Sequence, residues 1–263
     1  MQIVFYSVQF AKEVRFDLWW VSIFCKCRIL LQRGVGMVLT RKIKGIYPGR
    51  QLKDKAGVKL TRMFGQLEYP DFDPFLLLDI FDLKDSEKYI KGFPWQIDSG
   101  IVRMAYLIDG IAPQEKPIEN MRLSGVQLCI CVLSDKNMVE PAYHSIKSSE
   151  TKLVEIDKAK VKVILGRYGK ASVNFESIGP DTTLLDVEIK PYEEFEYKTE
   201  FDFNVSVFVI EGKGFFDNDK NDFVSKGSLA NFEEGKKIDV VASSQGVRFL
   251  LLSGKPSERK IDW

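Results

Sequence analysis

Residues 185–209 read LDVEIKPYEEFEYKTEFDFNVSVFV, and apolar side chains fall on alternate positions through most of this stretch. The odd-numbered positions carry the apolar residues Leu185, Val187, Ile189, Phe195, Tyr197, Phe201, Phe203, Val205, Val207 and Val209. Most even-numbered positions carry Asp, Glu, Lys, Asn or Ser. Because successive side chains of a β-strand point to opposite faces, this period predicts a half-buried antiparallel sheet of two strands joined by a tight turn.

Short apolar runs elsewhere in the chain extend this pattern. The run from Phe75 to Leu78 is continuously apolar, which indicates a strand buried on both faces. Further strands are predicted at residues 125–133 and 246–252, and the glycines within residues 211–214 predict a hairpin turn. No segment has the pattern of a long amphipathic helix, so the predicted fold class is all-β.

The 263 residues are sufficient for two domains of ordinary size. We expect residues 1–36 to be an extension outside the fold, followed by an N-terminal domain over residues 37–133. Residues 134–160 contain Pro141 and many Lys, Ser and Glu residues, which predicts a linker. The C-terminal domain then covers residues 161–263.

The extension is apolar, but Lys26 and Arg28 interrupt it before the ~20 apolar residues that a membrane span needs. It also lacks the order of a secretory signal peptide. One interpretation is an interfacial anchor with Trp19 and Trp20 at the lipid headgroups. The other is a segment that precedes a start at Met37 and takes no part in the fold. We favour the second and expect no membrane association.

Charge and cysteine content limit the function classes. Lys and Arg number 38 and Asp and Glu 37, a net charge of +1, so the sequence does not predict direct binding to nucleic acid or to an acidic substrate. The cysteines form two Cys-x-Cys pairs, Cys25 with Cys27 and Cys129 with Cys131, a spacing unsuited to zinc. We interpret Cys129 and Cys131 as small core residues on one strand face and expect an intracellular, reducing location.

Residues 92–110 read GFPWQIDSGIVRMAYLIDG, and DPFLLLD precedes them at residues 73–79. Together these stretches resemble the first metal-site strand of pirins, two-domain cupin proteins that bind iron. Shorter similarities follow in the same order and spacing at residues 125–128, 135–138, 141–143, 161–164, 185–188, 209–212 and 248–254. The resemblance implies a bicupin, in which two jelly-roll (double-stranded β-helix) barrels face each other and the N-terminal barrel holds the metal.

The chain departs from pirins at the positions that bind iron in that family. Gln96 and Asp98 stand where the first two histidines are expected, and Pro113 stands at the third. Only Glu115 keeps the family identity. The strands that the family has after Gly110 are missing from the sequence, so we expect the N-terminal barrel to be incomplete.

His144 is the single histidine of the chain, and we expect it on the surface of the predicted linker. A cupin-type iron site needs several imidazoles and a carboxylate, so one copy of the chain cannot build such a site. Gln96, Asp98 and Glu115 remain as vestigial metal positions that could hold a hard cation only weakly. We therefore expect no bound cofactor and no catalytic residues, although the family cofactor is iron.

Other catalytic motifs are also missing from the sequence. It contains no Gly-x-Ser-x-Gly elbow, Walker A loop or dinucleotide-binding fingerprint. Glu188, Glu194 and Glu196 alternate with apolar residues, which is typical of the solvated face of a sheet.

Three hypotheses for function remain. The favoured one is a non-catalytic binding or regulatory protein. Pirins act as cytoplasmic or nuclear cofactors of transcription regulators, so the resemblance implies that such regulators are the protein partners of this chain. The alternative is an iron-dependent activity like that of the pirin quercetin 2,3-dioxygenases. The third is a truncated or mis-spliced product without a settled function, since strands are missing and the chain ends at Trp263. In each case we expect the C-terminal barrel, residues 161–254, to be the more stable half.

Overall fold

The computed structural model of the chain describes residues 39–53, 59–65, 68, 71–83, 100–109, 123–132, 142–146, 150–179, 181–217 and 223–257. All of these residues belong to one compact unit, Leu39–Trp263. The predictions for residues 1–36 lie outside the described residues. The named elements within the described ranges are all strands, which confirms the all-β fold class. In the same ranges no helix is long and apolar enough to cross a membrane.

A six-stranded sheet, called the first sheet below, contains the strands of the N-terminal half. Its strands are β2 (Arg50–Lys53), β3 (Lys59–Phe64), β4 (Phe75–Leu83), β5 (Ile101–Asp109), β6 (Leu123–Cys131) and β7 (Ala142–Ile146). Their order is β2-β3-β4-β6-β5-β7, and all neighbours are antiparallel except β5 and β7, which are parallel. The strands predicted from Phe75 to Leu78 and over residues 125–133 are thereby confirmed.

A ten-stranded sheet, called the second sheet, contains the C-terminal half. Its strands are β1 (Ile43–Tyr47), β8 (Lys152–Ile156), β9 (Ala159–Tyr168), β10 (Ala171–Val173), β11 (Thr182–Ile189), β12 (Glu194–Lys198), β13 (Asn204–Phe215), β14 (Phe223–Ser225), β15 (Leu229–Phe232) and β16 (Lys237–Gly254). The main path is β1-β15-β13-β16-β11-β9-β10, while β12 pairs with β16, β14 with β13 and β8 with β9. The alternating stretch, residues 185–209, therefore forms three strands, β11, β12 and β13, rather than the predicted two.

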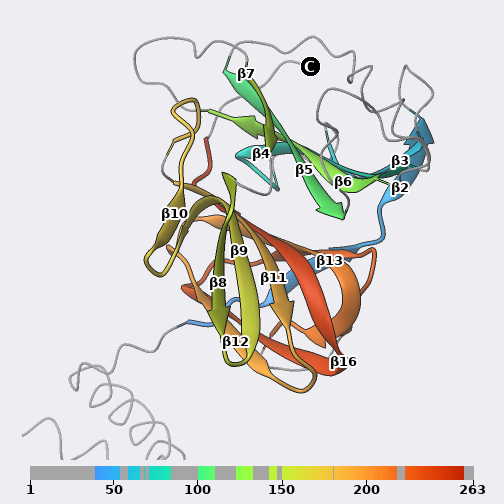
Figure 1. Ribbon diagram of the computed structural model, residues 1–263, viewed down its shortest axis with the longest axis vertical. Coiled ribbons are helices and arrows are strands. Elements are labelled where there is room, and N and C mark those ends of the chain that lie inside the picture. The colour runs from blue at the N-terminus through green and yellow to red at the C-terminus, as the bar shows by residue number, and fades with distance from the viewer. Residues whose placement is uncertain are drawn as a thin grey trace, which may run out of the picture. The chain divides into compact units, whose positions relative to one another are not determined.

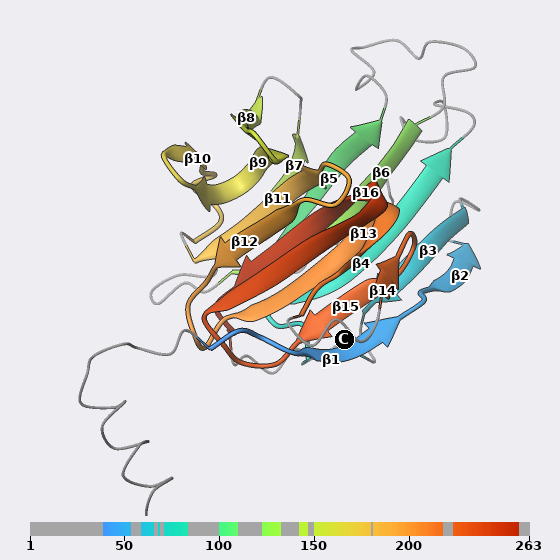
Figure 2. The same ribbon diagram turned by 90° about the horizontal axis from the view of Figure 1, so that it is seen from below.

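Strand β1 precedes the first sheet in the chain but pairs with β15 of the second sheet (Figure 2). Arg41, just before β1, is 1% exposed, and its hydrogen bonds hold β1 against the second sheet. Its Nη1 donates a hydrogen bond to the Glu233 carbonyl at 2.8 Å, and its Nη2 donates to the Glu200 carbonyl at 2.7 Å. Burial lowers the pKa of Arg41 to about 10, so the side chain remains charged at neutral pH.

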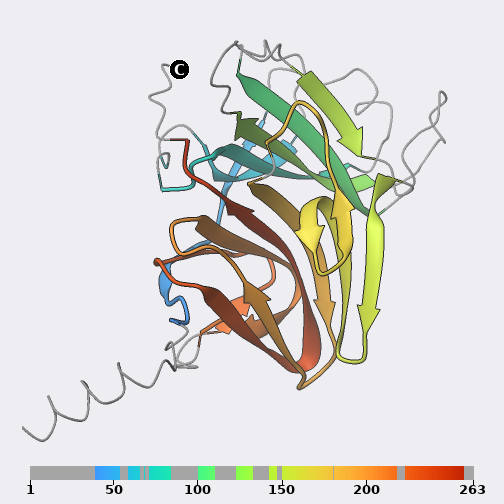
Figure 3. The ribbon, with the colours of Figure 1, turned by 90° about the vertical axis from the view of Figure 1, so that its left-hand side faces the viewer.

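The odd-numbered residues of the alternating stretch behave as predicted. Leu185, Val187, Val205, Val207 and Val209 are buried in a core formed by strands of the second sheet. The even-numbered positions differ from the prediction, because some of them are buried as well. In particular, Leu184 and Phe208 join Met104, Tyr106 and Leu128 in a second core that both sheets share. Figures 1 and 3 show the first sheet lying over one side of the second sheet.

The hairpin predicted at residues 211–214 is wrong. These residues lie inside β13, where the register with β16 is irregular between Gly212 and Gly214. Gly212 has a φ of 71°, and a Cβ built on it would lie 2.2 Å from the carbonyl oxygen of Gly246 in β16. The glycines therefore allow two strands to approach closely within the sheet, and the chain reverses only after Phe215.

The linker predicted over residues 134–160 also needs correction, because it contains two strands. Strand β7 pairs with β5 of the first sheet, and β8 pairs with β9 of the second sheet. Both strands have five residues, and the side chains of β8 are exposed or half-buried, so its polar composition resembles that of a connection.

Candidate functional site

The predicted ligand positions Gln96, Asp98, Pro113 and Glu115 lie outside the described residues, so the structure does not place them. The nearest described segment begins at Gly100 and continues into β5. Within the described residues, no group of three or more His, Cys, Asp or Glu side chains could hold a metal ion.

His144 is half-buried in β7, which corrects the prediction of a surface position in a linker. Its Nε2 lies 2.7 Å from Ser177 Oγ, and its ring lies 4.7 Å from that of Phe175. His144 is also paired in parallel register with Met104, a residue of the core between the sheets. The only imidazole of the chain therefore points to the side of the first sheet that faces the second sheet. The cause is the docking of β7 onto β5.

The opposite side of the first sheet, called the outer face, carries buried polar residues. Arg62 and Asp79 form a bidentate ion pair, with Nε–Oδ1 and Nη2–Oδ2 distances of 2.8 Å each. Asp79 is paired with Gln127 in the register of β4 and β6, and Gln127 is 3% exposed. Arg103, 6% exposed, is paired with Cys129 across β5 and β6. This row places two guanidinium groups and one carboxylate on the outer face.

Cys129 and Cys131 confirm the prediction of small core residues. Both are free thiols that are buried against Leu76 and Leu77. Burial raises the pKa of the Cys129 thiol, and the nearby Arg103 guanidinium offsets this only in part. The thiol is therefore protonated at neutral pH and is a poor metal ligand or nucleophile.

A buried polar network joins the two sheets near β5. Tyr106 Oη donates a hydrogen bond to Asp186 Oδ2 at 2.7 Å, and Asp186 is 4% exposed. Arg248 donates to the same carboxylate from Nη2 at 2.8 Å and from Nε at 3.0 Å. Its Nη2 also donates to the Ile108 carbonyl at 3.2 Å. Sequence reasoning missed this network, because Asp186 sits at an even position expected to be solvated.

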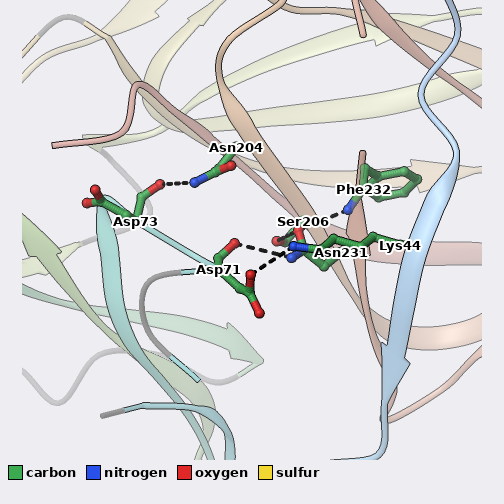
Figure 4. A network of polar contacts seen from close by, with 7 residues as sticks. All are labelled: Lys44, Asp71, Asp73, Asn204, Ser206, Asn231 and Phe232. Atoms are coloured by element: carbon green, nitrogen blue, oxygen red, sulfur yellow. Dashed lines mark hydrogen bonds and ion pairs between the residues drawn. The ribbon is translucent and has the colours of Figure 1, made fainter. Parts of the chain in front are cut away.

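A second polar network holds the segment that leads into β4 against the second sheet (Figure 4). Asn204 Nδ2 donates to the Asp73 carbonyl at 2.6 Å, and Asn231 Nδ2 donates to the Asp71 carbonyl at 3.2 Å. Lys44 of β1 forms an ion pair with Asp71 at 2.8 Å. The two asparagines bind backbone carbonyls of this segment, whereas Lys44 binds the Asp71 side-chain carboxylate. The three donors all come from strands of the second sheet.

A cavity of about 550 Å³ opens between the two sheets, a volume within the range of small-molecule sites. Among the described residues, its apolar lining comes from both sheets and includes Ile80, Phe81, Ile108, Phe208 and Ile210. The described lining also includes the polar residues Thr61, Asp82, Ser124, Glu211 and Lys226, together with Gly227. The cavity adjoins the Tyr106 network through Ile108, whose carbonyl accepts the Arg248 hydrogen bond.

Comparison with known proteins agrees with this architecture. Residues 184–263 match the Pirin C-terminal cupin domain. The chain is 27% identical over 253 residues to a pirin-like protein of Caulobacter vibrioides, covering 85% of this chain and 90% of that protein. The structure of GK1651 from Geobacillus kaustophilus is similar with a TM-score of 0.70 and 19% identity, covering 86% of this chain and all of the other. The quercetin 2,3-dioxygenase from Acinetobacter baumannii is similar with a TM-score of 0.65 and 16% identity, covering 85% and 90% of the two chains.

Two facing β-sheets with a C-terminal cupin domain define the chain as an all-β bicupin. Within that class, residues 184–263 match the cupin domain of the pirin family, and the chain is similar over most of its length to a pirin-like protein. The resemblance that the sequence suggested is thereby confirmed.

Proposed function

We propose that this chain is a pirin that acts as a non-catalytic binding or regulatory protein. The supporting observation is the number of histidine side chains that could bind iron. The chain has a single histidine, and His144 contacts Ser177 and Phe175 on the side facing the second sheet. A cupin-type iron site needs several neutral imidazoles, and Gln96, Asp98 and Pro113 cannot provide them. The donor set of the chain therefore does not fit the family iron.

The proposed mode of action is protein contact. By family resemblance the partners are regulators of transcription, and the location is the cytoplasm, the nucleus or both. A net charge of +1 gives no reason to expect direct contact with nucleic acid. A regulatory role of this kind does not require a redox cofactor, so it is compatible with the loss of the histidines.

Metal content and activity test this proposal together. The purified full chain is incubated anaerobically with Fe²⁺, freed of unbound metal and analysed for iron, and oxygen uptake is then measured with quercetin. The quercetin 2,3-dioxygenase from Acinetobacter baumannii serves as the positive control. We expect far less than one iron per chain and no quercetin-dependent oxygen uptake.

The second candidate function is an iron-dependent quercetin 2,3-dioxygenase-like activity. It is favoured by the likeness to the Acinetobacter baumannii enzyme, although a likeness at 16% identity concerns the fold. Close to one iron per chain together with quercetin-dependent oxygen uptake would establish this candidate and refute the non-catalytic proposal.

A further inference from the structure

The cavity between the sheets has an apolar wall that is already part of the protein core. Ile108 and Phe208 are 7% and 5% exposed, and both belong to the core shared by the sheets. Ile80 and Ile210 are half-buried and pack against the same core. An apolar group that enters the cavity would therefore meet an ordered surface contributed by β4, β5 and β13.

Two exposed side chains of opposite charge lie on the second-sheet side of this cavity. Glu211 belongs to β13, and Lys226 directly follows β14. The backbone N–H of Lys226 donates to the Gly212 carbonyl at 3.0 Å, which keeps the two residues on adjacent segments. Among the described residues neither side chain takes part in an ion pair. The neighbouring Arg248 is bound to Asp186 instead.

We propose that this cavity binds a small zwitterion with an apolar body, in particular an α-amino acid with a large apolar side chain. The Lys226 ammonium would bind the ligand carboxylate, and the Glu211 carboxylate would accept hydrogen bonds from the ligand ammonium. The apolar side chain would pack on Ile80, Ile108, Phe208 and Ile210. This inference does not rest on the absence of iron, since it is argued from Glu211, Lys226 and the described apolar lining alone.

L-Phenylalanine is the probe, and binding to the full chain is measured by isothermal titration calorimetry at neutral pH. Phenethylamine lacks the carboxylate, 3-phenylpropionate lacks the ammonium, and glycine lacks the apolar body. We expect one molecule of L-phenylalanine to bind per chain and each of the three analogues to bind about tenfold or more weakly, since each loses one class of contact.

Two variants test which side chain binds the ligand carboxylate and which binds the ligand ammonium. Lys226→Met should weaken L-phenylalanine and 3-phenylpropionate but leave phenethylamine unchanged. Glu211→Gln should weaken L-phenylalanine and phenethylamine but leave 3-phenylpropionate unchanged. Lys170→Met and Glu188→Gln are matched controls, because both residues are exposed and lie outside the cavity lining. Circular dichroism melting confirms that every variant is folded.

Three results would overturn the proposal. The first is no detectable binding of L-phenylalanine to the folded chain. The second is equal affinity for phenethylamine, which would make the cavity a cation site. The third is unchanged affinity in both the Lys226→Met and the Glu211→Gln variants. None of these results bears on iron content, so a failure here is distinguishable from a failure of the proposed function.

Discussion

The phenol of Tyr106 in the first sheet donates a 2.7 Å hydrogen bond to the buried carboxylate of Asp186 in the second sheet. Arg248 binds the same carboxylate from the other side through two nitrogens. The contact therefore links residues from the two halves of the chain at a point that excludes water. Its strength should decide how tightly the two sheets are joined.

Substitutions at this contact should lower the free energy of unfolding to different extents. Tyr106→Phe removes one hydrogen bond but leaves Arg248 on Asp186, so we expect a loss of about 1–2 kcal/mol. Asp186→Ala leaves the half-buried Arg248 guanidinium and the buried Tyr106 hydroxyl without this carboxylate, so we expect a loss of about 3–5 kcal/mol. Urea unfolding measures both. Tyr168→Phe is the control, since no hydrogen bond of its hydroxyl is found in the described residues. A loss for Tyr106→Phe no larger than for this control would contradict the prediction.

Stability should fall at alkaline pH because of the buried phenols. Burial raises the pKa of Tyr106, and the Asp186 carboxylate raises it further. Burial also raises the pKa of Tyr197 and Tyr168. The folded state then holds protons that the unfolded chain releases above pH of about 10, so the unfolding free energy decreases as pH rises through that region.

Urea unfolding at several pH values between neutral and alkaline measures this slope. We expect Tyr106→Phe to make the slope shallower above pH of about 10. Tyr192→Phe is the matched control, because the Tyr192 side chain is 75% exposed. Identical slopes in Tyr106→Phe and the unmodified chain would show that the Tyr106 phenol does not contribute.

Alanine substitutions at Gly212 and Gly169 separate two contributions to the loss of unfolding free energy. One is the steric clash of the new Cβ, and the other is the cost of a left-handed backbone conformation. Both have positive φ, 71° and 58°, but a Cβ on Gly169 meets nothing within 4 Å. Gly169→Ala should therefore cost about 1 kcal/mol, the usual cost of a left-handed conformation. Gly212→Ala should cost several times more, roughly 3 kcal/mol or above, because its Cβ would collide with the Gly246 carbonyl. Equal losses in thermal unfolding would refute the close approach of β13 and β16.

Native-state hydrogen exchange should find the slowest amides in β11, β13 and β16 of the second sheet. These strands are paired on both sides and carry both cores. The edge strands β2 and β7 of the first sheet should exchange faster, because each is paired on one side within the described residues. Better protection of the first sheet than of the second would contradict this order and the expectation that the C-terminal half is more stable.

Restoring histidines should not restore iron. The triple variant Gln96→His, Asp98→His and Pro113→His returns the family side chains to the ligand positions. We expect substoichiometric iron by elemental analysis if, as the resemblance implies, the strands that would support these ligands are missing. One iron per chain in the variant would show that the ligands alone limit binding.

Much of the second sheet could be predicted from the sequence, because period-two alternation reports strands directly. Leu185, Val187 and Val207 were placed correctly for this reason. The alternation does not reveal what covers the other face, so the burial of Asp186 and Leu184 against the first sheet was missed. Leu250 and Leu252, also at even positions of a predicted strand, were a signal that both faces are covered.

The remaining errors have a common physical origin in contacts between distant parts of the chain. Glycines at residues 211–214 favour a turn locally, and only the approach of Gly246 makes them a bulge. His144 looked exposed because its partners, Ser177 and Phe175, come from a later connection. The candidate metal positions Gln96, Asp98 and Glu115 lie outside the described residues, so their interpretation still rests on the sequence.

The pairing of β1 with β15 has a consequence for dividing this protein. The matched family segment, residues 184–263, lacks β1, β8, β9 and β10, which together complete the ten-stranded sheet. A fragment cut at that boundary would leave the edges of β15 and β11 open and remove Arg41 from its carbonyl partners. We expect such a piece to aggregate and not to fold by itself. Gene fusions and two-hybrid baits made from this protein should retain the chain from Leu39 onward.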